Sequence, residues 1–390
     1  MEHWNEAKIR DFAEVKGGKR LPKGKQLIKK PNSHPYIRIR DLGKAKYLQL
    51  NSEYEYVDDE TQKTIARYIV NTGDILISVV GTIGLIGIVG STLDKANQTE
   101  NCDKIVNIHG INPEYLYYYL VSNLGQEEIK RGTVGAVQPK LPLKNVLDII
   151  VKYPSILEQE RIVMILSVID EKIAVNEKIN NNLVQQAKSL YEEMFLNNPN
   201  ADMTPGVLSD IATITMGQSP SGNSYNEDGN GEVFYQGRAE FGFRFPNHRL
   251  FTTEPKRMAE IGDILLSVRA PVGDLNVAYE RCCIGRGLGA IQSKTGNNSF
   301  ILYTMLALKP QLDVYNGEGT VFGSINRDAL NSMPIHIPSE DKISQFESVV
   351  RPMDDMIRTN CDEIRHLETL RESLLPKLMS GEIDVSAIQF

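Results

Sequence analysis

Cationic and amide side chains recur in loop-like stretches of both halves of this 390-residue chain. Arg and Lys can bridge guanine O6 and N7 or neutralise phosphates, and Asn and Gln can pair with adenine N6 and N7. Such side chains in loops between short strands favour contact with DNA. The candidates are Lys16, Lys19, Arg20, Lys23, Lys25, Arg38, Arg40, Arg131, Thr133, Gln138 and Lys140 in the first half, and Gln218, Ser219, Gln236, Arg238, Arg269, Arg286, Thr320, Ser324, Asn326 and Arg327 in the second.

These candidates lie in an internal repeat that covers most of the chain. The segment GDILISVVGTIG at 73–84 returns as GDILLSVRAPVG at 262–273, and Pro154 corresponds to Pro338 at a spacing of 184. A repeat near 190 residues is a domain-sized unit and predicts two pseudo-equivalent halves. The copies differ most in the candidate loops, which predicts two similar frames that read two different half-sites. Arg40 and Arg238 are favoured among the candidates because they follow similar strand-like segments, PYIRIRDLG and VFYQGRAEFG.

A heptad pattern of apolar residues follows each globular part. Its 3-4 spacing predicts two long helices, and because a globular part lies between them, we expect an antiparallel pair. Both copies place an Asn in the seam, so Asn176 and Asn360 are expected to face each other. The predicted seam residues are Leu166, Ile169, Ile173, Asn176, Leu183, Leu190, Val350, Met353, Ile357, Asn360, Leu367 and Leu374.

The fold class predicted from these patterns is α+β, with two tandem β-rich globular domains separated by the two helices. Short apolar runs bounded by Gly, Pro, Asn and Asp indicate strands, and each globular part has one clear helix, capped by Asn112 or Asn298. The predicted bounds are 1–155 for the first domain, 156–197 for the first long helix, 198–206 for a linker, 207–338 for the second domain, 339–380 for the second long helix and 381–390 for a tail.

Composition restricts the function. The net charge is −7, but residues 1–50 hold 13 Lys or Arg against 5 Asp or Glu, which suits a polyanion-binding end. The four cysteines have no metal-ligand spacing, so no metal is expected. There is no membrane-length apolar run and no secretory signal, which predicts a cytoplasmic protein without a membrane partner. No phosphate-binding, nucleophile-elbow or zinc-protease motif is present, and we expect no catalytic residues.

The chain resembles the specificity subunits of type I restriction-modification systems over nearly its whole length. The resemblance rests on the duplicated GDIL segments, the PSILEQERI start of the first helix at 154–162 and LLPKLMSGEI at 374–383. It implies two target-recognition domains that each bind half of a split double-stranded DNA sequence. It also implies that the helices set the spacing and dock two methyltransferase subunits and, through them, the restriction (translocase-nuclease) subunits. S-adenosylmethionine is then expected only in the methyltransferase, and no cofactor in this chain.

Two other functions remain open from the sequence. One is a DNA methyltransferase or nuclease with an unrecognised active site, which cofactor binding by the isolated chain would distinguish calorimetrically. The other is a helical scaffold that never touches DNA, against which the basic first 50 residues count.

Overall fold

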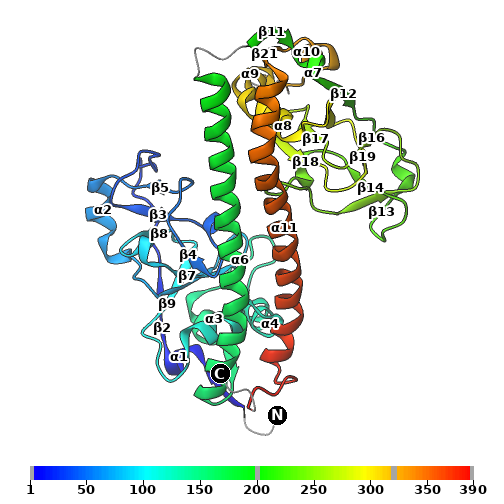
Figure 1. Ribbon diagram of the computed structural model, residues 1–390. Helices are drawn as coiled ribbons and strands as arrows, with labels where there is room; N and C mark the ends of the chain where they lie inside the picture. The colour runs from blue at the N-terminus through cyan, green and yellow to red at the C-terminus, as the bar shows by residue number, and fades with distance from the viewer. Residues whose placement is uncertain (1–3, 198–202, 318–322, 387–390) are drawn as a thin grey trace. The chain divides into compact units, whose positions relative to one another are not determined.

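The computed structural model describes residues 4–197, 203–317 and 323–386 (Figure 1). The chain divides into two compact units, one of Met1–Ala174 with Ile364–Phe390 and one of Val175–Glu363. Each of the two long helices, α6 (Ile156–Tyr191) and α11 (Glu340–Met379), therefore contributes one segment to each unit. This division differs from the domain bounds predicted from the sequence, in which the helices separate the domains.

The first unit contains a five-stranded sheet of order β2-β9-β6-β7-β4 and a three-stranded sheet of order β5-β3-β8. A further antiparallel pair joins β1 (Asn5–Lys8) to β10 (Ile150–Tyr153). The strands of the two sheets are β2 (Glu14–Gly17), β3 (Pro35–Ile37), β4 (Tyr47–Leu48), β5 (Glu55–Tyr56), β6 (Ile75–Ser78), β7 (Ile86–Val89), β8 (Asn97–Gln98) and β9 (Cys102–Val106). The helices are α1 (Ile9–Phe12), α2 (Asp59–Ile65), α3 (Pro113–Val121), α4 (Asn123–Gly132) and α5 (Leu143–Leu147), with 3-10 turns η1 (Ile39–Asp41), η2 (Ala66–Tyr68) and η3 (Ser91–Leu93).

The second unit repeats this plan with a four-stranded sheet of order β12-β20-β17-β18 and a five-stranded sheet of order β13-β15-β14-β19-β16. Its strands are β11 (Met203–Val207), β12 (Ala212–Met216), β13 (Tyr225–Asn226), β14 (Glu232–Tyr235), β15 (Leu250–Thr252), β16 (Met258–Ala259), β17 (Ile264–Ser267), β18 (Leu275–Val277), β19 (Cys282–Ile284), β20 (Leu288–Ser293) and β21 (Pro334–Pro338). The helices are α7 (Leu208–Ile211), α8 (Asn298–Ala307), α9 (Lys309–Asp313) and α10 (Arg327–Asn331), with η5 (Gly222–Ser224), η6 (Arg238–Glu240) and η7 (Val314–Asn316), and the π-helical turn η4 (Glu192–Leu196) follows α6.

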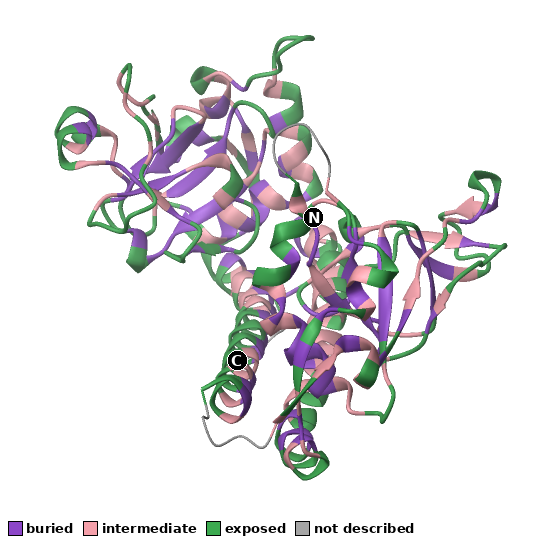
Figure 2. Ribbon diagram, turned by 90° about the horizontal axis from the view of Figure 1, so that it is seen from above, coloured by how far each residue is buried: buried purple, intermediate pink, exposed green. Residues whose placement is uncertain are grey.

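The repeated GDIL segment forms the central strand of each unit. In β6, Ile75 and Ile77 enter one hydrophobic core while Leu76 enters another on the opposite face of the sheet. In β17, Ile264 and Leu266 face the core on one side and Leu265 the core on the other. Successive side chains of a strand point to opposite faces, so a strand buried on both sides needs an unbroken apolar run. All four residues of β6 and all four of β17 are buried, and Figure 2 shows buried strands inside each globular part.

Each unit packs its globular part on the long helices through apolar contacts. In the first unit, Ile162 and Leu166 of α6 and Leu378 of α11 belong to the core that also holds β6 and α3. In the second, Tyr191 of α6 and Phe346 of α11 share the core of β17 and α8. These contacts remove an apolar helix stripe from water, which is the main source of stability for a long amphipathic helix.

The predicted seam lies on the inner side of the helix pair. In the first unit Asp170 contacts Arg371 while Leu166 shares a core with Leu378. In the second, Asn176 contacts Glu363 and Asn180 contacts Asn360. The contacts move backward along α11 as they move forward along α6, so the helix segments run antiparallel in both units. The seam residues that are buried are Leu166, Ile169, Ile173, Asn176, Val350 and Ile357, and those that are half-buried are Leu183, Leu190, Met353, Asn360, Leu367 and Leu374.

The predicted contact between Asn176 and Asn360 is wrong by one helical turn. Asn360 donates to Asn180 Oδ1 at 2.8 Å, whereas Asn176 donates to Glu363 Oε2 at 2.8 Å. Repeat-equivalent residues of an antiparallel pair meet only if they lie on its pseudo-two-fold axis. Asn176 and Asn360 lie on either side of that axis, so each meets a residue about one turn further along the other helix.

Two local predictions also need correction. The segment Met203–Val207 is not linker, as the range 198–206 predicted, but strand β11, paired with β21. Pro205 is tolerated there because a two-stranded pair leaves every strand with a free edge. Residues 198–202 lie outside the described residues. In the second unit the residue preceding α8 is Asn297, not Asn298, and its side chain makes no capping bond, whereas Asn112 caps α3 through Glu114 and Tyr115 as predicted.

The Asn180–Asn360 pair allows a stability test. Replacing Asn360 alone with Leu removes a donor from the buried Asn180 carbonyl oxygen and should cost about 1 to 3 kcal/mol. Replacing both with Leu should recover that loss or exceed it, because two apolar groups leave no buried polar atom unpaired. Thermal unfolding of the two single variants and the double variant measures this. Additive losses in the double variant would contradict the assigned contact.

Candidate nucleic-acid interface

Five loops from distant parts of the first unit meet at one edge of its sheets, which we name the first loop edge (residues 17–20, 38–41, 79–85, 98–101 and 134–140). Backbone hydrogen bonds hold them together. Lys19 N donates to Gln98 O at 3.3 Å, and Val79 N donates to Asn101 O at 2.8 Å. The remaining contacts are Gly18 N to Cys102 O, Thr99 N to Ile37 O, Leu141 N to Val79 O and the bridge between Val80 and Lys140.

The second unit has the same arrangement, the second loop edge (residues 217–219, 236–240, 268–274, 285–287 and 323–325). Gln218 N donates to Ile284 O at 3.0 Å, and Val268 N donates to Gly287 O at 3.0 Å. The other equivalents are Gly217 N to Leu288 O, Gly285 N to Tyr235 O, Ile325 N to Val268 O and the bridge between Arg269 and Ser324. Six backbone contacts are thus repeated, although few of the side chains at these positions are shared.

A glycine begins the first loop of each edge for a steric reason. A Cβ on Gly18 would lie 2.0 Å from Thr99 O, and a Cβ on Gly217 would lie 2.2 Å from Gly285 O. Real Cβ atoms do not approach backbone oxygens so closely, so any side chain would separate the two loops. The close approach brings residues 19 and 20, and likewise 218 and 219, beside the loop that precedes the neighbouring strand, β9 in the first unit and β20 in the second.

The side chains at equivalent positions of the two edges carry different chemistry. On the first edge Arg20 donates to Glu100 at 2.6 Å, and on the second the corresponding residues are Ser219 and Arg286. Burial acts to raise the pKa of Glu100, but the hydrogen bond from Arg20 lowers it below the ordinary value, so this pair stays charged. The Arg286 guanidinium is exposed and, within the described residues, has no acidic partner.

The structure brings thirteen of the predicted residues to the two edges. Those on the first edge are Lys19, Arg20, Arg38, Arg40, Gln138 and Lys140, and those on the second are Gln218, Ser219, Gln236, Arg238, Arg269, Arg286 and Ser324. Several are held by acids of their own unit. Arg38 pairs with Glu55 at 2.5 Å, Arg40 donates to Glu53 O at 2.8 Å, and Arg238 pairs with Asp274.

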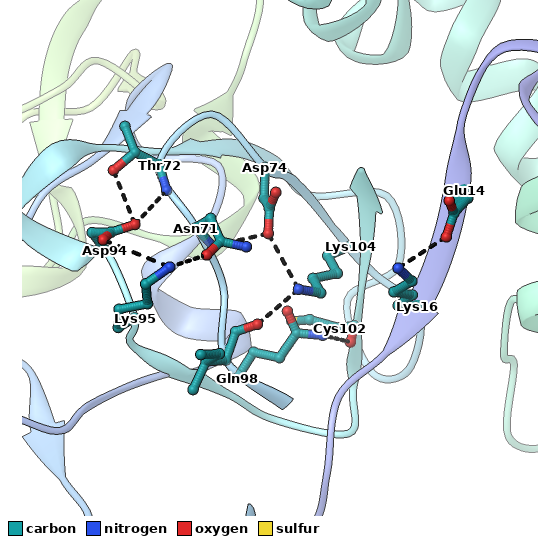
Figure 3. A network of polar contacts seen from close by, with 11 residues as sticks. Glu14, Lys16, Asn71, Thr72, Asp74, Asp94, Lys95, Gln98, Cys102 and Lys104 are labelled. Carbon is teal, nitrogen blue, oxygen red and sulfur yellow. Dashed lines mark hydrogen bonds and ion pairs between the residues drawn. The ribbon is translucent and has the colours of Figure 1, made fainter. Parts of the chain in front are cut away.

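Other predicted residues are used inside the fold. Lys16 lies on β2 and pairs with Glu14 of the same strand at 2.9 Å (Figure 3). Lys25 pairs with Asp58 and Glu60 at the start of α2, and Arg131 with Glu128 on α4. Thr133 Oγ1 donates to Ile129 O, and Asn326 caps α10, whose first residue is Arg327. Lys23 is exposed beyond Arg20, and Thr320 lies outside the described residues.

Arg40 and Arg238, the two favoured candidates, differ by one position in the turns η1 and η6. In the first unit Asp41 accepts from the Arg38 backbone, and in the second Glu240 accepts from the Gly237 backbone. Matched on these caps, Arg40 is the second residue of η1 and Arg238 the first residue of η6. One extra residue after β14 moves Arg238 onto a different side of the turn, where it meets Asp274.

Sequence reasoning missed two buried cations, Lys46 and Arg244, which lie between each globular part and its long helix. Each is flanked by apolar residues, in KAKYLQL and FGFRFPN, which is an unusual setting for a charge and could have identified them. No helix within 4–197, 203–317 and 323–386 is long and apolar enough to cross a membrane. The same ranges contain no group of three or more His, Cys, Asp or Glu placed to hold a metal ion.

Two similar frames with different side chains at their edges define a class of duplicated protein with two equivalent but chemically different loop surfaces. The comparisons agree with this class. The model of the type I restriction modification DNA specificity domain matches residues 1–185 and 200–359, so the chain belongs to that family.

Named relatives match over almost their whole length. A protein named as the specificity subunit of the type I restriction enzyme MjaX of Methanocaldococcus jannaschii is 30% identical over 98% of this chain and 94% of its own. The MjaIX specificity subunit of the same organism is 24% identical over 99% and 94%. The crystal structure of the type I restriction-modification S subunit from M. genitalium has a TM-score of 0.57 at 17% identity, with 96% of both chains covered, and shows a shared fold.

One carboxyl group beside the first loop edge predicts a pH dependence of stability. Asp103 on β9 pairs with Gly17 in the sheet register, and burial raises its pKa to about 6. Between about pH 4 and pH 6 the folded state therefore binds more protons than the unfolded state, and stability falls as the pH rises. Replacing Asp103 with Asn should raise the free energy of unfolding at pH 7 by on the order of 2 kcal/mol. Urea unfolding should show no such gain below about pH 4, and an equal gain at both pH values would contradict this explanation.

The exposed cations without acidic partners should contribute most to phosphate binding. Lys19, Lys23 and Lys140 have no carboxylate partner among the described residues, so replacing all three with Ala should flatten the salt dependence of DNA binding by about 0.9 in slope per lost phosphate contact. Fluorescence titration with DNA at several salt concentrations measures this. Lys16→Ala with Lys25→Ala is the matched control, because these lysines already pair with acids of their own unit. An equal change in the control would contradict the assignment.

Proposed function

We propose that this chain is the DNA-specificity subunit of a type I restriction-modification enzyme. The observation that carries the proposal is the pair of loop edges, built from the same six backbone contacts but lined by different side chains. Each edge reads one half of a bipartite double-stranded DNA target, with affinity mainly from phosphate contacts and specificity from base edges. Family membership and the names of the relatives support the same role.

The helix pair sets the spacing of the half-sites and binds the partners. Two methyltransferase subunits dock on it, and the restriction subunits join through them. In this proposal the chain supplies recognition, and the chemistry belongs to the partners. S-adenosylmethionine binds to the methyltransferase, where a flipped adenine needs its own pocket. The complex acts in the cytoplasm, where the DNA is.

Exchange of one domain tests the proposal. Residues 1–155 replaced by the corresponding domain of a relative should change one half of the methylated sequence and leave the other half unaltered, because each loop edge forms within its own unit. Replacing residues 207–338 in the same way is the reciprocal control and should change only the other half. The measurement is methylation-site sequencing of DNA from cells that carry the chimaera and the methyltransferase. A change in both halves, or in neither, would contradict the proposal.

A further inference from the structure

Each long helix carries an aspartate at the same place in the repeat. Asp170 and Asp354 are 184 residues apart, the spacing that also relates Pro154 to Pro338. Each accepts a hydrogen bond from a buried tyrosine of its own globular part. Tyr118 of α3 donates to Asp170 at 2.5 Å, and Tyr303 of α8 donates to Asp354 at 3.3 Å. Each bond lies within its own unit and joins a short helix to a long one: α3 to α6 in the first unit and α8 to α11 in the second.

A buried cation completes each contact. Lys46 Nζ donates to the Tyr118 hydroxyl at 3.1 Å and to Ser167 of α6 at 2.7 Å, and it also pairs with Glu114. We name Lys46, Tyr118 and Asp170 the first docking triad.

In the second docking triad, Arg244 pairs with Asp354 at 3.2 Å and donates to the Tyr303 hydroxyl at 3.3 Å. The two cations occupy the same backbone position, since Lys46 O accepts from Ile88 and Arg244 O accepts from Val277 at 2.8 and 2.9 Å.

The triads add little net free energy to the contact between each globular part and its long helix. Lys46 and Arg244 are 8% and 7% exposed. The free-energy cost of removing such a charge from water offsets most of the stabilisation that its ion-pair and hydrogen-bond partners provide. The apolar cores that run from each globular part onto the helices already supply attraction. Apolar contact does not fix the angle of the globular part on the helix, because burial of apolar area is non-directional. Hydrogen bonds do restrict this angle, because they weaken steeply when they bend.

Further polar contacts of the helix pair surround each triad. In the first unit Arg371 of α11 donates to Asp170 at 2.7 Å, so the aspartate is held from both sides. In the second unit Arg358 of α11 donates to Tyr279 O at 3.0 Å and lies 4.3 Å from the Tyr279 ring. Each globular part is thereby oriented on the helix pair by charged groups at more than one point.

We propose that Lys46 and Tyr118 in the first unit, and Arg244 and Tyr303 in the second, are positioning residues for spacing selectivity. They hold each recognition domain at one angle on the helix pair and so restrict the number of unread base pairs between the two half-sites. The proposal rests on the proposed function. Lys46 lies next to β4 and Arg244 accepts from β18, so a tilt at either triad moves the sheet to which the loop edge is attached.

The test uses the full complex of this chain with its methyltransferase and a DNA library in which both half-sites are constant and only the gap varies. Tyr118→Phe keeps the ring that packs beside Lys46 but removes the bond to Asp170. Methylation at gaps one base pair shorter or longer, relative to the preferred gap, should rise about tenfold, the factor that corresponds to about 1.4 kcal/mol. Tyr303→Phe should broaden the gap preference in the same way.

Matched controls separate positioning from stability. Tyr119→Phe makes the same change one residue away, where the hydroxyl donates to Ile150 O inside the globular part, and Tyr225→Phe removes a bond to Pro220 O in the second unit. Both controls should retain the wild-type gap profile, whatever they do to the melting temperature. A folded, active Tyr118→Phe variant with an unchanged gap profile would overturn the proposal, as would equal broadening by the controls. If the wild-type complex methylates no bipartite sequence, the proposed function itself fails.

Discussion

A buried cation with polar partners on both the globular part and the long helix is the constraint on which each unit of this protein depends. Lys46 contacts Tyr118 of α3 and Ser167 of α6, and Arg244 contacts Tyr303 of α8 and Asp354 of α11. The three groups must meet at hydrogen-bonding distance, so the position of the sheet on the long helix is set by geometry as well as by apolar area. The position of each sheet in turn sets the position of its loop edge, because the loops connect strands of that sheet.

The loop edges show how one frame can carry two specificities. Their contacts are made by backbone atoms, so a side chain that points outward can change without altering the frame. The positions of Glu100 and Arg286 illustrate this, since an acid paired with Arg20 in one unit corresponds to an exposed arginine in the other. Glycines such as Gly18 and Gly217 are an exception, because the neighbouring backbone leaves no room for a Cβ. Loops on a rigid scaffold are the usual place for such variation.

Polar residues in the seam favour one register of the two long helices. Asn176, Asn180 and Asn360 are seam residues with polar partners in the second unit, which favours one register because a slip would leave a buried amide unpaired. The correction to the Asn176 contact follows from the pseudo-two-fold symmetry of the pair. The 184-residue spacing identifies which positions of the two helices are equivalent. The position of the pseudo-two-fold axis depends instead on how the side chains of the two helices interdigitate, which the sequence of one helix does not determine.

The duplication, the α+β class, the apolar seam of the two long helices and the Asn112 cap could all be predicted from the sequence. These features follow from patterns such as a repeat, heptad spacing, an unbroken apolar run or an N-cap residue, whereas the family was indicated by a resemblance of motifs. Which cations reach the edges depends on the folded chain, because Lys25 pairs with Asp58 and Glu60, acids 33 and 35 residues away in the sequence. The tertiary structure also decided the one-residue shift of Arg238 and the two docking triads. Those depend on long-range contacts, in which the partners of a buried charge come from segments more than fifty residues apart.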